Sequence, residues 1–172
     1  VIHVSGNVDP IRDIETINLE LIFADMDVIE KRIPKIEKKA LSKVDKESII
    51  EYELLKRIYQ NLVDQKPIRT MILTKDEQKL IKVFSFLTAK PIIYLANIQE
   101  SELGREDNEH VKKVKEYAAK ENARVVSLCA KVEEELSELD EEDKQEMLEG
   151  LGLDGSGLDK LIKSSYSLLG LQ

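Results

Sequence analysis

Two short apolar segments separated by one amphipathic stretch constrain the fold of this chain more than any other feature. The first, at 91–96, reads PIIYLA and lacks polar alternation, which is typical of a strand buried on both faces. An amphipathic stretch at 108–121 follows, and a second strand-like segment lies at 124–129. A strand, a helix and a strand at this spacing predict a parallel βαβ unit with a right-handed crossover.

The segment before this unit predicts an antiparallel pair of helices. Apolar residues recur every three or four positions over 14–36 and again over 50–62, on either side of a polar break at 42–48. Asp9 is suited to cap the first helix, and Pro34 predicts a kink or a helix boundary. The apolar positions expected on the inner face of the first helix are Ile14, Ile17, Leu21, Ala24, Val28, Ile29, Ile33 and Ile36.

The remaining pattern predicts a short helix from Thr74 to about Phe84 and two tail helices at 140–149 and 157–169. Two strands are fewer than the roughly four to six of a usual sheet. We therefore expect further strands before Val1, and a chain that is a piece of a longer protein.

Charge and cysteine content exclude several classes of protein. The formal net charge of −8 argues against a protein that wraps nucleic acid with its whole surface. The single cysteine cannot form an internal disulfide, and no apolar run approaches the roughly 18 residues of a membrane span. We expect a cytoplasmic protein that does not insert into a membrane.

Polar residues follow both predicted strands at their carboxyl ends, the edge at which open α/β sheets bind ligands. Asn97 to Glu100 come directly after the first strand, and Ser127 to Lys131 end the second. In guanine-nucleotide-binding P-loop proteins, these two places hold the base-reading Asn-Lys-x-Asp loop and the Ser-Ala-Lys loop. The matched spacing of the two loops predicts a nucleotide-base site, which neither tetrapeptide predicts alone.

Four segments carry a resemblance to one family: DPIRDIETINLEL at 9–21, FLTAKPIIYLANIQE at 86–100, CAKVEEELSELDEEDKQE at 129–146 and LDKLIKSSYSLLGLQ at 158–172. Through them the chain resembles the YchF subfamily of Obg-like P-loop NTPases over essentially its whole length. The resemblance implies a nucleotide-binding domain, a coiled-coil arm inserted within it and a C-terminal TGS domain. It implies that this chain is the second half of the nucleotide-binding domain plus the arm.

The resemblance also implies the fold class and the domains. The expected fold is α/β, a partial parallel sheet of the P-loop NTPase type with an inserted antiparallel helical coiled-coil arm at 20–73. Residues 1–19 and 74–172 would belong to the nucleotide-binding domain. No G-x-x-x-x-G-K-[ST] phosphate loop occurs in the chain. Mg²⁺ and the triphosphate would therefore be held by residues outside it, and the chain alone is not expected to hydrolyse nucleotide.

The first loop departs from the usual motif, since Ile98 replaces its Lys and Glu100 replaces its Asp. The longer Glu side chain displaces the carboxylate, and a displaced acceptor loses most of its discrimination for guanine. Family members similar to this chain carry Asn-x-x-Glu and favour ATP. The expected ligand is ATP, with GTP weaker, and its base would contact Asn97 and the backbone of Ile98. The alternative is that Asn97 only caps a turn and Glu100 is solvated.

The second loop has Cys129 in the place of the motif's Ser. This loop would contact a base mainly through backbone N–H groups, including those around Ala130, and these survive the change. Cys129 itself is predicted to be a small buried hydrophobic residue, because nothing in the sequence around it activates a thiol.

The tip of the predicted arm is basic. Residues 31–46 carry seven basic and two acidic side chains, a local net charge of +5 in an acidic chain. This asymmetry suits contact with a phosphate backbone, and the resemblance to ribosome-associated NTPases implies the ribosome or its RNA as the partner. The alternative is a solvated coiled-coil face. The basic residues are Lys31, Arg32, Lys35, Lys38, Lys39, Lys43 and Lys46.

Three other patterns carry no predicted site. The ten carboxylates of 133–149 are dispersed by helical spacing, so we expect a solvated helix face and no metal site. Gly150, Gly152 and Gly155 fit G-x-G-x-x-G but follow a polar helix, so they are predicted to be helix-end and turn positions. His3 and His110 are too isolated to form a metal site.

The sequence therefore favours the base-binding half of a ribosome-associated, ATP-preferring P-loop hydrolase. The alternative is a non-enzymatic helical adaptor whose hairpin binds RNA or protein.

Overall fold

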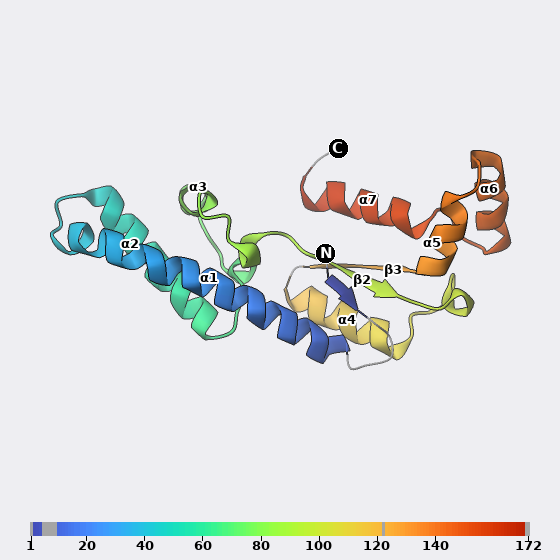
Figure 1. The fold of residues 1–172 in the computed structure, drawn as a ribbon, viewed down its shortest axis with the longest axis horizontal. Helices are drawn as coiled ribbons and strands as arrows, with labels where there is room; N and C mark the ends of the chain where they lie inside the picture. The colour runs from blue at the N-terminus through green and yellow to red at the C-terminus, as the bar shows by residue number, and fades with distance from the viewer. Residues whose placement is uncertain (1, 5–9, 122, 171–172) are drawn as a thin grey trace. The chain divides into compact units, whose positions relative to one another are not determined.

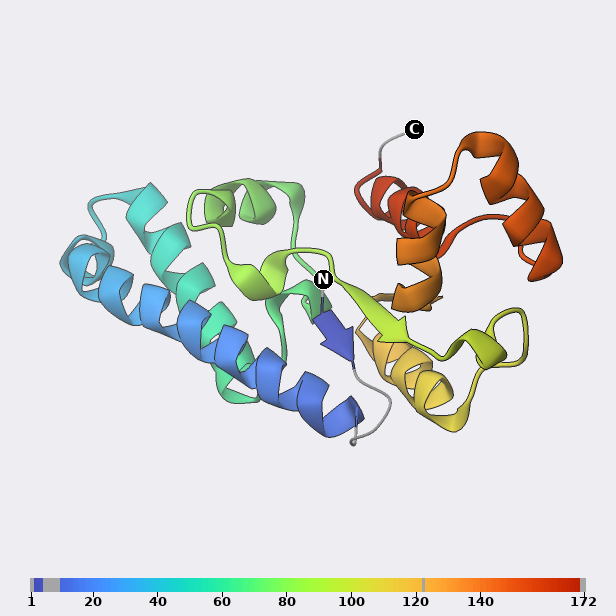
Figure 2. The ribbon, with the colours of Figure 1, turned by 45° about the vertical axis from the view of Figure 1, so that its right-hand side comes forward.

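The computed structural model describes residues 2–4, 10–121 and 123–170, and these form two compact units (Figures 1 and 2). One unit comprises Val1–Ile14 with Pro91–Gln172, and the other comprises Glu15–Lys90. None of the described helices is long and apolar enough to cross a membrane. The expected cap Asp9 lies outside the described residues.

The first unit contains a parallel three-stranded sheet in the order β1-β2-β3. The strands are β1 (Ile2–Val4), β2 (Ile93–Asn97) and β3 (Arg124–Leu128), and α4 (Glu109–Lys120) connects β2 to β3. The predicted βαβ unit and its α/β class are confirmed. β1 was not predicted, because a strand of three residues is too short to show a hydrophobic period.

Helices cover both faces of this sheet. α4 packs on one face of β2 and β3, and α7 (Gly157–Leu168) packs against β3 from the other side, as Figures 1 and 2 both show. The chain passes from β3 to α7 through α5 (Ala130–Ser137) and α6 (Glu141–Gly150). A small core joins these two helices to the loop after β3, and it comprises Cys129, Val132, Leu136 and Leu148.

The glycines after α6 take the roles that the sequence predicts. Gly150 ends α6, and Gly152 adopts a φ of 71°, which a side chain would strain. The element directly before the turn is the helix α6 and not a strand, so the G-x-G-x-x-G match lacks the context of a dinucleotide site.

The second unit contains the predicted antiparallel hairpin of α1 (Pro10–Leu41) and α2 (Lys46–Val63). Tyr59 donates to Glu30 at 2.5 Å and Tyr52 donates to Glu37 at 3.4 Å, so positions later in α1 face positions earlier in α2. α1 continues through Pro34 to Leu41, and the predicted helix boundary is therefore wrong. Packing of α1 against α2 on both sides of Pro34 holds the helix together, through Ile29, Ile36, Leu54, Leu55 and Ile58.

The inner face of α1 differs from the predicted apolar stripe. Ala24 is exposed, whereas the polar residues Asn18 and Asp25 are buried. The buried set is Ile14, Asn18, Ile22, Asp25, Ile29, Ile36 and Ala40. The stripe was misplaced because a hydrophobic pattern does not count a buried carboxylate or amide as an inner position.

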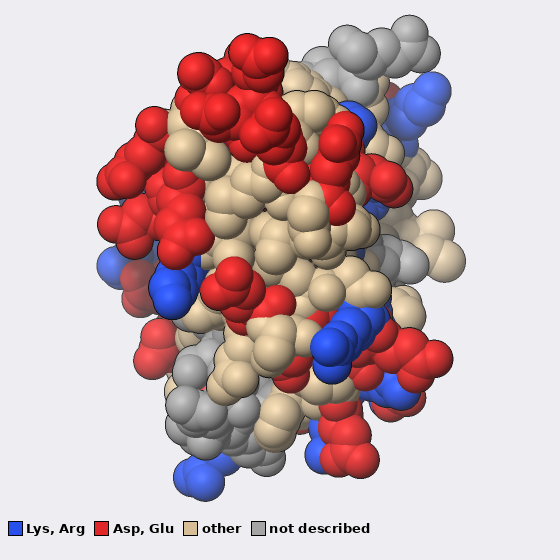
Figure 3. All heavy atoms as spheres, turned by 90° about the vertical axis from the view of Figure 1, so that its right-hand side faces the viewer, with Lys and Arg blue, Asp and Glu red and all other residues tan. Residues whose placement is uncertain are grey.

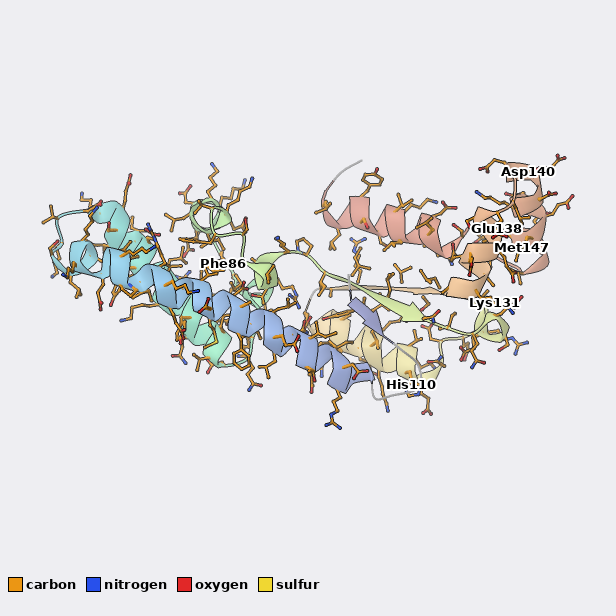
Figure 4. All side chains as sticks on the ribbon, viewed as in Figure 1. Phe86, His110, Lys131, Glu138, Asp140 and Met147 are labelled. Carbon is orange, nitrogen blue, oxygen red and sulfur yellow. The ribbon has the colours of Figure 1, made fainter. Side chains whose placement is uncertain are left out.

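The boundaries of this unit also differ from those expected for the arm, which was predicted to end at residue 73. The structural division falls after Lys90, since α3 (Lys75–Lys82) and the short helix Leu87–Ala89 pack with the hairpin. Ile81 and Phe86 share the hairpin core; Phe86 is labelled in Figure 4. At the other end, the division falls after Ile14 and not after residue 19.

Candidate functional site

A pocket lies at the carboxyl ends of β2 and β3, where the sequence predicts a ligand. Its volume is about 670 Å³. Asn97 is the last residue of β2, and Cys129 directly follows β3. The structure thus brings all five predicted base-site residues around one pocket. The lining residues are Asn97, Ile98, Gln99, Glu100, Ser101, Cys129, Ala130 and Lys131.

Two hydrogen bonds join the loops that form this pocket. The backbone N–H of Ile98 donates to the carbonyl of Leu128 at 2.9 Å, which extends the ladder one residue beyond β2. The backbone N–H of Ala130 donates to Oδ1 of Asn97 at 3.1 Å. Because a backbone N–H only donates, the atom that faces it must be the amide oxygen of Asn97. The amide nitrogen of Asn97 is then left as a donor for a ligand.

Glu102 fixes the conformation of the first loop. Its carboxylate accepts from the backbone N–H of Gln99 at 2.8 Å and from Nδ2 of Asn108 at 2.9 Å. The hydrogen bond from Asn108 is the largest cause that holds the pKa of Glu102 below its ordinary value of 4.5, and the hydrogen bond from Gln99 is the next largest. This stabilisation of the loop is present at neutral pH and is lost on acidification through the lowered pKa.

The two residues that depart from the guanine motif lie differently in the pocket. Ile98 is half-buried, and Glu100 is exposed. Within the described part of the chain, no side chain donates a hydrogen bond to the Glu100 carboxylate. The polar groups that line the pocket therefore include the donor amide of Asn97 and the exposed carboxylate of Glu100.

Cys129 is buried, with 4% of its surface exposed, and it packs against Val132 and Leu136. The prediction of a small buried hydrophobic residue is confirmed. Lys131, labelled in Figure 4, lies in the first turn of α5 and lines the same pocket. Gln99 and Lys131 lie in the two predicted loops but were not named as base contacts, and Ser101, next to the first loop, was missed although its adjacency could have indicated it.

The basic residues of the arm do not all remain available for a partner. Nζ of Lys31 pairs with Asp27 at 2.7 Å, and Arg32 binds Glu51 through two hydrogen bonds of 2.8 and 3.1 Å. Both guanidinium bonds link α1 to α2, so Arg32 belongs to the hairpin interface. Five exposed lysines near the tip form no ion pair within the described chain: Lys35, Lys38, Lys39, Lys43 and Lys46.

The acidic stretch over α5 and α6 is mostly solvated, and Figure 3 shows Asp and Glu side chains gathered on that end of the molecule. Glu133 is an exception, since its carboxylate accepts from the backbone N–H groups of Gly157 at 2.6 Å and Leu158 at 3.3 Å. It thereby caps the start of α7 from another helix. A Cβ on Gly157 would lie 2.4 Å from Cβ of Leu128, so this close approach requires glycine.

A parallel sheet covered by helices, with a pocket at the carboxyl ends of two neighbouring strands, is the architecture of a partial P-loop NTPase domain. A scan against models of protein families finds no match. Known proteins nevertheless match the chain over its whole length. It is 53% identical to the "Ribosome-binding ATPase YchF" of Bacillus subtilis (strain 168), over 99% of this chain and 47% of that protein.

Two further relatives agree with this match. The "Ribosome-binding ATPase YchF" of Haemophilus influenzae is 43% identical over 100% of this chain and 47% of that protein. The solved structure of the Schizosaccharomyces pombe YchF GTPase matches with a TM-score of 0.86 and 28% identity, over 98% of this chain and 48% of that chain. The chain belongs to the YchF family, and it spans about half the length of the curated relatives it matches.

Proposed function

We propose that this chain supplies the base-binding loops and the helical arm of a nucleotide-binding P-loop NTPase. That protein would hydrolyse ATP, in preference to GTP, to ADP and phosphate as a cytoplasmic, ribosome-associated switch. The observation that carries the proposal is the hydrogen bond from Ala130 to Asn97, which joins the loops after two adjacent strands around one pocket. The names of the relatives, which describe ribosome-binding ATPases and a GTPase, support the same activity and partner.

The geometry of Asn97 suggests how a purine would bind. With its oxygen occupied by Ala130, its Nδ2 can donate to N7, an acceptor that adenine and guanine share. Asn97 would therefore recognise a purine without selecting between the two bases. Selection against guanine would come from the departures at Ile98 and Glu100.

The metal ion and the hydrolytic step fall outside these residues. Among the described residues, no group of three or more His, Cys, Asp or Glu side chains could hold a metal ion. The pocket itself carries one carboxylate, that of Glu100. These residues do not fit a Mg²⁺ site, so Mg²⁺ and the triphosphate would be held by other residues of the parent protein, and the chain alone would be inactive.

Replacing Asn97 tests the pocket directly in the full-length protein. Asn97→Ala should weaken ATP binding by roughly tenfold to a hundredfold in calorimetric titration, because it removes both the donor to the base and the link to Ala130. Asn97→Asp separates these roles, since a carboxylate still accepts from Ala130 but cannot donate to N7. We expect Asn97→Asp to bind ATP about as weakly as Asn97→Ala.

Ser101→Ala provides the matched control, because Ser101 lines the same pocket and is exposed. This variant should bind ATP like the unchanged protein. Wild-type affinity in Asn97→Asp would remove the proposed base contact. No measurable binding of ATP or GTP by the unchanged protein would favour the non-enzymatic adaptor.

Restoring the guanine motif tests the ATP preference. The double variant Ile98→Lys with Glu100→Asp should shift the ratio of ATP to GTP affinities toward GTP by roughly tenfold or more, because Asp places two acceptor oxygens where guanine donates. Each single variant should have a smaller effect. Unchanged relative affinities in parallel ATP and GTP titrations would show that these positions do not set the preference.

A further inference from the structure

The outer edge of β3 carries backbone groups that no strand uses. β3 is the last strand in the order β1-β2-β3, and no other described strand pairs with its far side. Within its parallel ladder with β2, the N–H of Arg124 donates to Ile92 and the carbonyl of Leu128 accepts from Ile98. In a parallel pair, alternate residues bond to the same neighbour. Residues 124, 126 and 128 therefore bond to β2, and the N–H and C=O groups of Val125 and Ser127 point to the free edge.

This free edge opens into a hollow of about 480 Å³ that is separate from the candidate base pocket except at Ile98. Val125, Val126 and Ser127 of β3 line it, α4 contributes Val111 and Lys115, and α7 contributes further residues. The hydroxyl oxygen of Ser127 is buried and has no hydrogen-bond partner among the described residues. The hollow thus combines unused hydrogen-bonding groups with apolar walls.

The free charges around the hollow are mainly positive. Of its three carboxylates, Glu102 already accepts two hydrogen bonds and Asp107 pairs with Lys115. The groups without such partners in the described chain are three cations and one carboxylate: Arg105, Lys160, Lys163 and Glu106. In a chain of net charge −8, this local excess favours a negatively charged partner.

We propose that the edge of β3 binds an extended acidic peptide segment as a fourth strand. Backbone pairing with Val125 and Ser127 would supply affinity, as in other cases of strand addition. Alternate side chains of the peptide would contact the apolar lining residues Val111 and Leu153, and Lys160 and Lys163 of α7 would select acidic flanks.

The test uses the natural full-length protein and a synthetic ten-residue peptide with alternating Thr and Val in its centre and two Glu at each end. Amide hydrogen exchange should slow by about tenfold or more at Val125 and Ser127 when the peptide is added. The amides of Val126 and Leu128, which already bond to β2, should not change. Two further peptides carry N-methyl groups on the odd-numbered or on the even-numbered residues. Alternate N–H groups of a strand point to opposite sides, so only one of the two sets blocks pairing with β3, and the two affinities should differ by about tenfold or more.

Two protein variants provide a second line of evidence. Val125→Pro removes an N–H that faces the hollow and leaves the ladder with β2 intact, so it should abolish binding, whereas Val125→Ala keeps the N–H and should bind. Lys160→Glu with Lys163→Glu should weaken binding of the acidic peptide and improve binding of a peptide with Lys flanks.

Four results would overturn the proposal. The first is failure of the parent peptide to bind, and the second is equal affinity of the two N-methylated peptides. The third is slow exchange at Val125 and Ser127 in the protein without peptide. The fourth is protection of these amides by an oligouridylate of equal charge and not by the peptide, which would assign the hollow to RNA.

Discussion

Reversing the charge of Lys35, Lys38 and Lys39 to Glu should greatly reduce co-sedimentation of the full-length protein with ribosomes. Each lysine that contacts a phosphate releases about one counterion. The slope of log affinity against log salt is negative, and loss of three contacts should make it less steep by roughly two to three. At moderate salt, the bound fraction should fall by about tenfold or more. Pelleting is measured over a series of salt concentrations.

Control variants within the same unit separate a local contact from a general charge effect. Lys75, Lys79 and Lys82 lie on α3 and are exposed, so their replacement by Glu makes the same change in net charge. This control should retain most of the binding. Equal pelleting of the arm variant and the unchanged protein would leave the solvated coiled-coil face as the better account of the basic tip.

The structure also ranks the seven basic residues of the arm. Lys31 is engaged with Asp27, and Arg32 is held between α1 and α2 by Glu51. Replacing Lys31 should therefore affect ribosome binding less than replacing Lys38. Replacing Arg32 should act mainly on the stability of the hairpin. A count of charges along the sequence cannot make this distinction, because it depends on which carboxylates face them.

The position of the candidate pocket could be predicted from the sequence because its parts are local. A buried strand that ends in Asn97 and a second strand that ends before Cys129 must bring their carboxyl ends to one edge of a parallel sheet. The hydrogen bond between Asn97 and Ala130 then spans 33 residues of sequence but only two adjacent strands. The strand positions were sufficient to predict which loops meet.

The extent of the arm unit could not be predicted in the same way. One interaction that ties residues 74–90 to the hairpin joins Asp25 to Thr88, which are 63 residues apart, and neither side chain contributes to an apolar pattern. Glu133 illustrates the same limit, since its role as a cap of α7 depends on a residue 24 positions away. Polar contacts of long sequence separation leave no periodic signal.

Replacing Asp25 by Ala should strongly destabilise the unit formed by Glu15–Lys90. Asp25 is 2% exposed and accepts from the backbone N–H groups of Leu87 and Thr88, each at 2.8 Å, and from the Thr88 hydroxyl at 2.6 Å. The same hydroxyl oxygen accepts from the backbone N–H of Ile68 at 3.2 Å. Alanine would leave several buried donors without an acceptor, at a cost of about 3 to 5 kcal/mol.

Native-state hydrogen exchange measures this loss within the unit itself. Protection of the α2 amides should fall by roughly two to three and a half orders of magnitude in Asp25→Ala, since about 1.4 kcal/mol corresponds to a factor of ten in an equilibrium constant. Asp27→Ala is the matched control, because Asp27 lies two positions further along the same helix, is exposed, and pairs with Lys31 on the surface. That variant should change stability by less than about 1 kcal/mol. If the α2 amides of Asp25→Ala exchange as in the unchanged protein, Asp25 is not what joins residues 74–90 to the hairpin.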